Sequence, residues 1–236
     1  MQHVRKMTSR TRRAGSLHAL AAILLLPMWL IAGGGCTSLS GAAADSVKLL
    51  VHGHKSHVSP TAQSVAAKPY YQLKVSSKAG SALLVLGNID HGREAWYSAT
   101  GEILFLRHGV LVKTWAMQPD ILATQLPADS PFRTGLQHLT GVTHTTRSLD
   151  LPGYRYGVPV DATLTPVGTE TVDILGTPHQ LLRVDEHLDA GEAGFRADNR
   201  YWVDPRDGFV WKSRQSIPGG LTLTLTELKP YRGEGT

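Results

Sequence analysis

The sequence contains one cysteine, Cys36, and no apolar run as long as a typical membrane-spanning helix. The apolar stretch near the amino terminus, Ala19–Ala32, has about 14 residues, whereas a bilayer requires about 20. A single cysteine excludes a disulfide within the chain. Burial of apolar side chains and backbone pairing must therefore stabilise the fold.

Acidic residues are absent from the first 35 positions, where the charged residues are Arg5, Lys6, Arg10, Arg12 and Arg13. The apolar stretch follows, and Gly33-Gly34-Gly35-Cys36 comes after it. A basic head, a short apolar run and a small-residue exit are typical of a secretory signal. A thiol directly after the small residues is what a bacterial lipoprotein signal requires, because that sulfur receives the diacylglycerol.

Two other interpretations stay open, namely a retained membrane helix and an ordinary cleaved signal with an incidental cysteine. Gly33 stands where lipoprotein signals usually have an aliphatic residue. We favour the lipoprotein signal, since several acyl chains on Cys36 would anchor the chain firmly, at about 0.8 kcal/mol for each buried methylene. This interpretation divides the chain into a signal peptide (1–35), the lipidated cysteine with a flexible tether (36–68) and a single β domain (69–236).

The net charge of +5 belongs to the signal peptide. Removing its five basic residues from the 24 in the chain leaves 19, equal to the 19 acidic residues. Nucleic-acid binding depends on clustered basic side chains that neutralise phosphates. The near-neutral mature chain shows no such cluster, so a nucleic-acid partner is not expected.

Short apolar or alternating segments separated by turn residues predict an antiparallel β structure. Leu221–Thr226 alternates strictly between Leu and Thr, and the Asp204–Gly208 segment has the Pro and Gly of a tight turn. Ser46–His52 could be a short helix or strand, at a position that suits a segment packing on the domain. The predicted strands are Tyr71–Val75, Ser81–Leu86, Glu94–Ser98, Glu102–Arg107, Val110–Ala116, Val142–Leu149, Tyr156–Pro166, Glu170–Leu175, Pro178–His187, Asn199–Val203, Phe209–Ile217 and Leu221–Leu228.

Two segments in the middle of the chain predict short amphipathic helices. Pro119-Asp120 begins the first, which runs to Gln125, and Ser130-Pro131 begins the second, which runs to Leu139. The fold class expected is therefore mainly β: a wide antiparallel sheet, curved into a half-barrel or folded into a sandwich, with two short helices between its halves.

Few residues form a recognisable catalytic or metal-binding pattern. His52, His54 and His57 have ligand chemistry, but alternation along a strand would turn His57 away from the other two. A solvated polar segment is the simpler interpretation, so no metal or other cofactor is expected. The sequence has neither a convincing nucleophile elbow nor a phosphate-binding glycine loop.

Two carboxylate pairs, Asp185 with Glu186 and Asp189 with Glu192, could in principle act on a glycosidic bond. The glycines around Asp189 and Glu192 favour charges at a hairpin tip instead. We therefore expect no catalytic residues, while an enzyme that modifies polysaccharide stays an alternative.

Aromatic residues flank the Asp204–Gly208 turn. Trp202 and Trp211 lie on the two strands of this hairpin, where they can form a cross-strand core pair. The functional alternative is a platform that stacks on sugar rings, with Asn199, Arg200 and Gln215 supplying polar contacts.

Two segments resemble the YjbF family of GfcB-like lipoproteins. Glu94–Thr114 (EAWYSATGEILFLRHGVLVKT) is similar to the family pattern W-S-x-D-G … L-x-x-x-x-G-R-L-V-x-T, with Val110 in place of the usual arginine. Asn199–Gln215 resembles the second family segment, and Tyr154–Gly157 and Ile174–Gly176 resemble weaker patterns between them. The resemblance spans about residues 40–231, and it adds Trp96 as a candidate contact for glycan or partner.

The resemblance implies an outer-membrane lipoprotein, facing the periplasm, that assists secretion of capsule or other exopolysaccharide without catalysing a reaction. It implies partners from the same operon, including an outer-membrane β-barrel and polysaccharide-export proteins, besides polysaccharide itself. Thr37 after Cys36 agrees with sorting to the outer membrane. A carrier of lipid in a half-barrel cavity is a further alternative.

Overall fold

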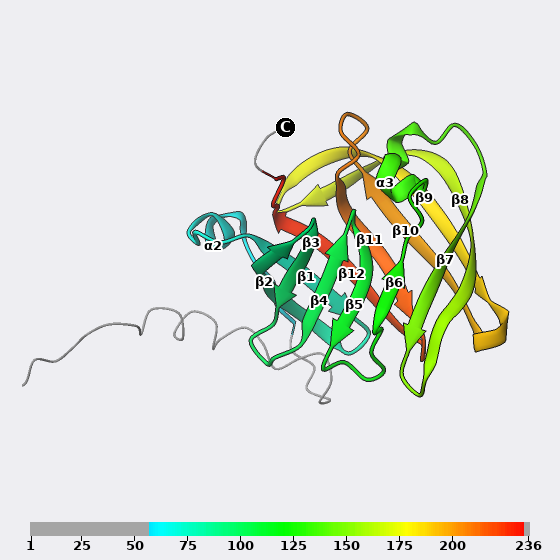
Figure 1. The fold of residues 1–236 in the computed structure, drawn as a ribbon. Helices are drawn as coiled ribbons and strands as arrows, with labels where there is room; N and C mark the ends of the chain where they lie inside the picture. Colours follow the sequence, from blue (N-terminus) through cyan, green and yellow to red (C-terminus); the bar gives the residue numbers. More distant parts are fainter. Residues whose placement is uncertain (1–56, 234–236) are drawn as a thin grey trace, which may run out of the picture. The chain divides into compact units, whose positions relative to one another are not determined.

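The computed structural model describes residues 57–233, which form one antiparallel sheet with short helices (Figure 1). Its twelve strands follow the order β5-β4-β3-β2-β1-β12-β11-β10-β9-β8-β7-β6. The strands are β1 (Gln72–Ser77), β2 (Gly80–Asp90), β3 (Arg93–Tyr97), β4 (Ile103–Arg107), β5 (Val110–Trp115), β6 (Ala123–Gln125), β7 (Thr143–Leu151), β8 (Arg155–Ile174), β9 (Thr177–Ala190), β10 (Phe195–Val203), β11 (Val210–Ile217) and β12 (Leu221–Lys229). The predicted fold class is confirmed, and each predicted strand overlaps an observed one.

The sheet curves until its two edge strands, β5 and β6, meet (Figure 1). The backbone N–H of Thr114 in β5 donates to the carbonyl of Ile121, just before β6, at 2.9 Å. The hydroxyl of Thr124 in β6 lies 3.5 Å from the carbonyl of Leu111. Of the two predicted arrangements, the half-barrel is the one observed, and its curvature continues almost to closure.

Alternation along the strands explains the core. In β12, Leu223, Leu225 and Glu227 are buried inside the barrel, while the threonines between them face outwards. Trp96 of β3 is paired with Leu104 and is fully buried in the largest hydrophobic cluster. The interior is therefore filled with side chains contributed by nearly all strands.

The β8–β9 hairpin reaches beyond the barrel and covers part of its outer face. The sequence predicted separate strands for residues 156–166 and 170–175, but β8 is continuous, with a register shift between Pro166 and Gly168. Beyond this bulge, Val172, Ile174 and Leu181 pack against Trp202 of β10. A β-bulge bends a strand locally, which allows one long hairpin to serve two packing surfaces.

The predicted helix at Pro119–Gln125 is wrong. Asp120 instead closes a turn, because its Oδ1 accepts hydrogen bonds from Thr114 Oγ1 (2.7 Å) and Met117 N (3.0 Å). Thr114 Oγ1 in turn accepts from the N–H of Ile121 at 2.8 Å. The segment is thus extended beside β5, and it supplies the edge strand β6.

The second predicted helix begins where expected but is short. Helix α3 covers Pro131–Thr134 and ends at Gly135, whose φ of 105° is outside the helical range. A 3-10 turn, η1 (Leu136–His138), follows, and a similar turn, η2 (Gly191–Ala193), joins β9 to β10. Phe132 and Leu136 are buried, in agreement with their predicted helical face.

Helix α2 (Ala62–Ala66) was not predicted, since it falls in the part of the chain assigned to the tether. Thr61 and Ser64 form a capping box at its start, and Val65 is buried. Gln72 of β1 donates to the carbonyl of Val65 at 3.0 Å. The short helix is therefore fixed against the sheet. Within residues 57–233, none of the helices is both long and apolar enough to cross a membrane.

Candidate functional site

The residues predicted to contact glycan or a partner divide into an interior group and an outer group. Trp96 belongs to the interior: its side chain is 0% exposed, and its Nε1 donates to Glu94 Oε2 at 2.9 Å. Its prediction as a surface contact is wrong, because alternation along β3 directs it into the barrel. Asn199 and Gln215 are also buried.

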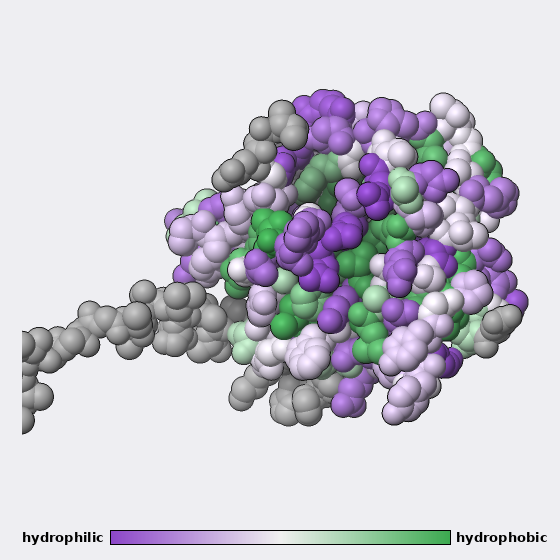
Figure 2. Space-filling view, viewed as in Figure 1, coloured by the Kyte–Doolittle hydropathy of each residue, from purple (hydrophilic) through white to green (hydrophobic). Residues whose placement is uncertain are grey.

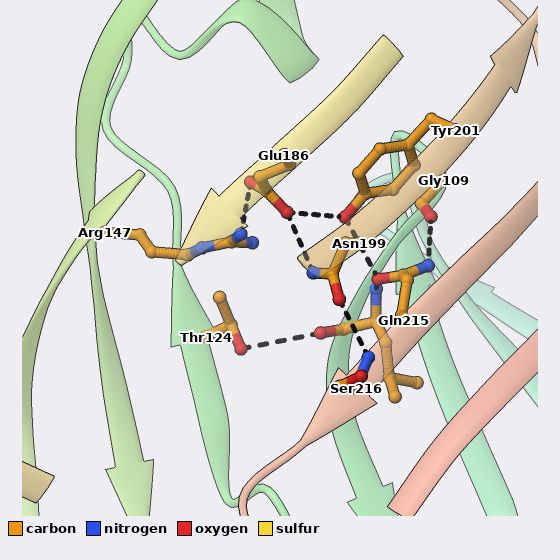
Figure 3. Close-up of polar contacts among 9 residues, drawn as sticks. Gly109, Thr124, Arg147, Glu186, Asn199, Tyr201, Gln215 and Ser216 are labelled. Carbon is orange, nitrogen blue, oxygen red and sulfur yellow. Dashed lines mark hydrogen bonds and ion pairs between the residues drawn. The ribbon is translucent and has the colours of Figure 1, made fainter. Parts of the chain in front are cut away.

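Asn199 and Gln215 take part in a buried polar network that crosses the barrel interior (Figure 3). Glu186 of β9 forms an ion pair with Arg147 of β7 and accepts hydrogen bonds from Asn199 Nδ2 (2.9 Å) and Tyr201 Oη (3.0 Å). Asn199 Oδ1 accepts from the N–H of Ser216 at 2.8 Å. The network therefore joins β7, β9, β10 and β11 from inside.

Gln215 extends this network to the β4–β5 turn. Its Oε1 accepts from the N–H of Leu111, and its Nε2 donates to the carbonyl of Gly109, both at 2.9 Å. Gly109 itself lies close to Val210, because a Cβ at this glycine would come within 2.5 Å of Val210 Cγ2. The contacts of Gln215 are thus structural, and they hold two distant parts of the sheet together.

The electrostatics of the network keep Arg147 charged. Burial by itself lowers the pKa of Arg147, but the charge of Glu186, the proximity of Tyr201 and the hydrogen bonds with both together outweigh it and raise the pKa above its usual value. Burial, followed by the proximity of Glu186, raises the pKa of Tyr201 well above its ordinary value, so that its hydroxyl stays a donor. Every member of the network has a partner, as stability requires of buried polar groups.

The space beside this network is small. A cavity of about 20 Å³ lies among residues that include Arg147, Asn199 and Gln215. This is room for about one water molecule. The interior at this point cannot hold a sugar unit or an acyl chain.

The two tryptophans of the β10–β11 hairpin lie under the β8–β9 hairpin. Trp202 is 7% exposed and donates from Nε1 to Glu170 Oε2 at 2.7 Å. Across the strand pair it faces Lys212, whose Nζ lies 4.8 Å from its ring centroid. Trp202 is therefore a packing residue, and the sugar platform considered as the alternative does not form there.

Trp211 lies in the same outer cluster and is half-buried. Its ring centroid is 4.5 Å from that of His179 and 5.3 Å from that of Phe209. The guanidinium of Arg232 lies 4.9 Å from the same ring. These neighbours surround the indole, so Trp211 also serves mainly to hold the hairpin.

Arg200, the remaining predicted contact, lies in a polar groove of about 320 Å³ on the outer face of β8–β11. We call this the outer groove. The side chains that face it come from four neighbouring strands, because alternate residues share one face: Thr163, Thr165, Asp185, His187, Asp198, Arg200 and Arg214. Of these residues, only Arg200 was predicted from the sequence as a contact, because the groove depends on which strands lie side by side.

Ion pairs organise the outer groove. Asp185 accepts from Arg200 Nε at 3.0 Å and from Arg183 Nε at 2.7 Å. The hydrogen bonds from Arg183, followed by the charge of Arg200, lower the pKa of Asp185 despite its partial burial. His187 Nδ1 and Asp198 Oδ1 lie 2.8 Å apart. The groove thus presents fixed donors and acceptors side by side, which suits a ligand rich in hydroxyl groups.

The carboxylates considered for glycoside hydrolysis are not arranged as a catalytic pair. Asp185 faces the outer groove, whereas Glu186 is buried in the interior network. Two acids that act on one bond must flank it from the same space. Asp189 pairs with Arg196 beside the β9–β10 turn, as expected at a hairpin tip.

Metal-binding groups are equally sparse in the described part of the chain. Among residues 57–233, no three His, Cys, Asp or Glu side chains gather as a metal site would require. His57 is exposed, and its predicted neighbours His52 and His54 lie outside the described residues.

The opposite face of the domain, over β3–β7, is shown in Figure 2. Apolar residues there form small patches separated by hydrophilic ones. Exposed apolar side chains on this part of the chain include Trp115. Isolated residues of this kind are common on soluble domains and need no special function.

Comparison with known proteins gives the chain its family. Residues 44–228 match the family model described as "Group 4 capsule polysaccharide lipoprotein gfcB, YjbF". The chain belongs to the YjbF family. The match covers β1–β11 and β12 up to Leu228, and it also includes residues 44–56, ahead of the described part.

Two individual proteins agree with membership of the YjbF family. The uncharacterized lipoprotein GfcB of Escherichia coli (strain K12) is 24% identical over 210 residues, covering 88% of this chain and 98% of that protein. The crystal structure of the hypothetical lipoprotein YmcC from Escherichia coli (K12) superposes with a TM-score of 0.65 at 24% identity. The superposition covers 73% of this chain and 90% of the YmcC chain, and it supports the fold described here.

Proposed function

We propose that this YjbF-family chain is a non-enzymatic lipoprotein that assists the secretion or assembly of capsule or another exopolysaccharide. In this proposal, acyl chains on Cys36 anchor it to the outer membrane, and the β domain faces the periplasm. The domain holds polysaccharide, and it docks export proteins that include an outer-membrane β-barrel. The family description, which names group 4 capsule polysaccharide, supports the process.

The outer groove is the observation that carries the glycan part of this proposal. Arg200 and Arg214 offer N–H donors beside the acceptors Asp185 and Asp198. Arg200 is half-exposed, so part of its guanidinium stays accessible although Nε is bonded to Asp185. Donors and acceptors fixed on rigid strands match the vicinal hydroxyls of a sugar at little entropic cost.

Docking without catalysis agrees with the placement of the charged groups. The groove carboxylates are paired with arginine or histidine, and Glu186 is enclosed by Arg147, Asn199 and Tyr201. General acid catalysis needs a carboxyl with a raised pKa facing the substrate, whereas the pKa of Asp185 is lowered.

Deletion of the gene tests the proposal. We expect surface polysaccharide to fall while its cytoplasmic precursors persist, because synthesis continues and only secretion is impaired. Unchanged surface polysaccharide would contradict the proposal. Incubating the purified protein with the strain's own glycan tests the enzymatic alternative. New reducing ends would show that the protein hydrolyses the glycan and would contradict a role in docking alone.

A further inference from the structure

A second cavity, of about 350 Å³, lies on the outer face of the β1–β3 region beside helix α2. We call it the α2 cavity. Apolar side chains form much of its wall, among them Leu83 and Val85 of β2, Tyr97 of β3 and Pro60. A volume of this size is in the range of sites that hold a ligand or a peptide side-chain cluster. Nothing in the described chain fills it.

The chain enters the described domain at the rim of this cavity. The N–H of Val58 donates to Ser81 Oγ at 2.9 Å, and Val58 itself contributes to the cavity wall. Thr61 then caps α2. Because Ser81 and Leu83 are two residues apart on β2, the point of entry is only about 7 Å from the apolar wall along the strand.

An apolar segment precedes this point of entry. Val47, Leu49, Leu50 and Val51 are clustered within Ser46–His52, in a stretch otherwise rich in small and polar residues. Seven steps separate Val51 from Val58, and an extended chain of that length spans at most about 25 Å. The segment can therefore turn back and reach the wall formed by Leu83 and Tyr97.

Family similarity includes this segment. The match to the YjbF family begins at residue 44, well before the first described residue, and it continues through the whole sheet. A featureless linker has no reason to belong to the matched region, whereas a segment that packs on the domain does. Burial of four aliphatic side chains in an apolar cavity would also stabilise the docked state, since each fully buried aliphatic side chain contributes about 1.5–3 kcal/mol.

We propose that Val47–Val51 docks in the α2 cavity as an intramolecular strap. The strap leaves only Thr37–Ser46 as free chain between the cysteine and the domain. Ten residues span at most about 36 Å, whereas the twenty residues Thr37–Ser56 would span about 70 Å. The strap therefore holds the β1–β3 side of the domain close to its anchor and leaves the outer groove of β8–β11 free.

Cross-linking of the full-length protein, purified from membranes, tests the strap. Leu49→Cys or Leu50→Cys is combined with Leu83→Cys, and a short bis-maleimide joins the thiols without the strict geometry of a disulfide. The matched control replaces Leu83→Cys by Ile89→Cys, an exposed position six residues further along β2, about 20 Å away. Single-cysteine variants report any reaction with Cys36.

We expect at least one of the Leu83 pairs to cross-link at least tenfold faster than the same segment cysteine paired with Ile89→Cys. Equal rates with both positions, or no cross-linking at either, would overturn the strap. Hydrogen exchange gives a second measurement without any substitution in the cavity. The amides of residues 46–51 should exchange at least tenfold more slowly than those of an unstructured chain. This protection should disappear in the variant Leu49→Asp/Leu50→Asp. Fast exchange in the unsubstituted protein, or an acyl chain found in the cavity by mass spectrometry of the native protein, would also overturn it.

Discussion

Gln215 Oε1 accepts a 2.9 Å hydrogen bond from the backbone N–H of Leu111, a residue 104 positions away in the sequence. The two residues lie on β11 and β5, which are not neighbours in the sheet order. The bond crosses the barrel interior, and a second bond from Gln215 Nε2 to the carbonyl of Gly109 lies beside it. A side-chain amide thus links β11 to β5 across the interior, where no backbone ladder joins the two strands.

Gln215→Ala should lower the free energy of unfolding by about 2–3 kcal/mol. The substitution removes the partner of the buried N–H of Leu111 and of the half-buried carbonyl of Gly109, and a buried polar group left unpaired costs about 1–3 kcal/mol. Urea unfolding followed by tryptophan fluorescence measures the change. Arg214→Ala is the matched control, since its exposed side chain should change stability by no more than about 0.5 kcal/mol. Equal effects of the two substitutions would show that Gln215 does not hold the sheet.

Arg147 and Glu186 should be strongly coupled. Arg147→Met or Glu186→Leu alone leaves a buried charge without its partner and should cost about 3–5 kcal/mol. The double variant removes both charges, and its cost should be clearly below the sum of the two single costs. A double-mutant cycle in urea measures this difference. Additive costs would mean that the interaction between Arg147 and Glu186 does not contribute to the free energy of unfolding.

Glu227 should make stability fall as the pH rises. Burial, and then the nearby charge of Glu94, raise the pKa of Glu227 well above its ordinary value, and its Oε2 finds no hydrogen-bond partner among the described residues. The folded state therefore keeps a proton on Glu227 that the unfolded state releases above about pH 4.5. The contribution of protonated Glu227 to the free energy of unfolding is fully present below that pH, and it is lost as the pH rises through the pKa of the folded state.

Glu227→Gln removes this dependence. We expect the variant to have a higher Tm than the unsubstituted protein at pH 8 and nearly the same Tm at pH 4, where both side chains are neutral. Thermal unfolding at the two pH values measures the difference. A variant whose Tm is lower at pH 8 would indicate that ionised Glu227 is stabilised in the folded protein.

Cys36 should carry acyl chains in the protein isolated from its own cells. We expect cleavage before Cys36 and acylation of its sulfur and amine because of the basic head, the apolar run and the small residues. Intact-mass measurement of the detergent-extracted protein tests this directly. An unmodified thiol, or a protein that still carries residues 1–35, would remove the proposed anchor.

Much of the strand content was accessible from the sequence, because side-chain alternation is a local property. Leu221–Thr226 alternates strictly, and it became β12 with its leucines inside or half-buried. Trp96 was misjudged because its environment depends on register: it lies opposite Leu86 and Leu104 inside the barrel. A single sequence does not state which strands are neighbours.

The errors and omissions share this non-local origin. Pro119-Asp120 is compatible with a helix start and with a turn, and the bonds from Thr114 and Met117 to Asp120 select the turn. The outer groove needs β8, β9, β10 and β11 side by side. The charged residues on each strand were visible, but their meeting on one face followed only from the topology.

The outer groove should determine glycan binding in solution. Arg200→Ala/Arg214→Ala removes two of its cationic donors, and we expect at least a fivefold loss of affinity for oligosaccharides from the strain's own polysaccharide. Affinity electrophoresis in gels that contain the polysaccharide measures the change. Arg196→Ala, at an exposed arginine of the β9–β10 hairpin, controls for the loss of an arginine outside the groove. Each mobility is compared with that of the same protein in a gel without polysaccharide, and equal relative retardation of the control and the double variant would remove the groove as the binding site.

The most direct test of the account is the distribution of polysaccharide in a deletion strain complemented with this same Arg200→Ala/Arg214→Ala variant. With equal amounts of protein in the membrane, we predict that the fraction of polysaccharide on the cell surface stays close to that of the deletion strain. The unsubstituted chain and Arg196→Ala should both restore it. Full restoration by the double variant would contradict the claim that this domain acts in secretion through its outer groove.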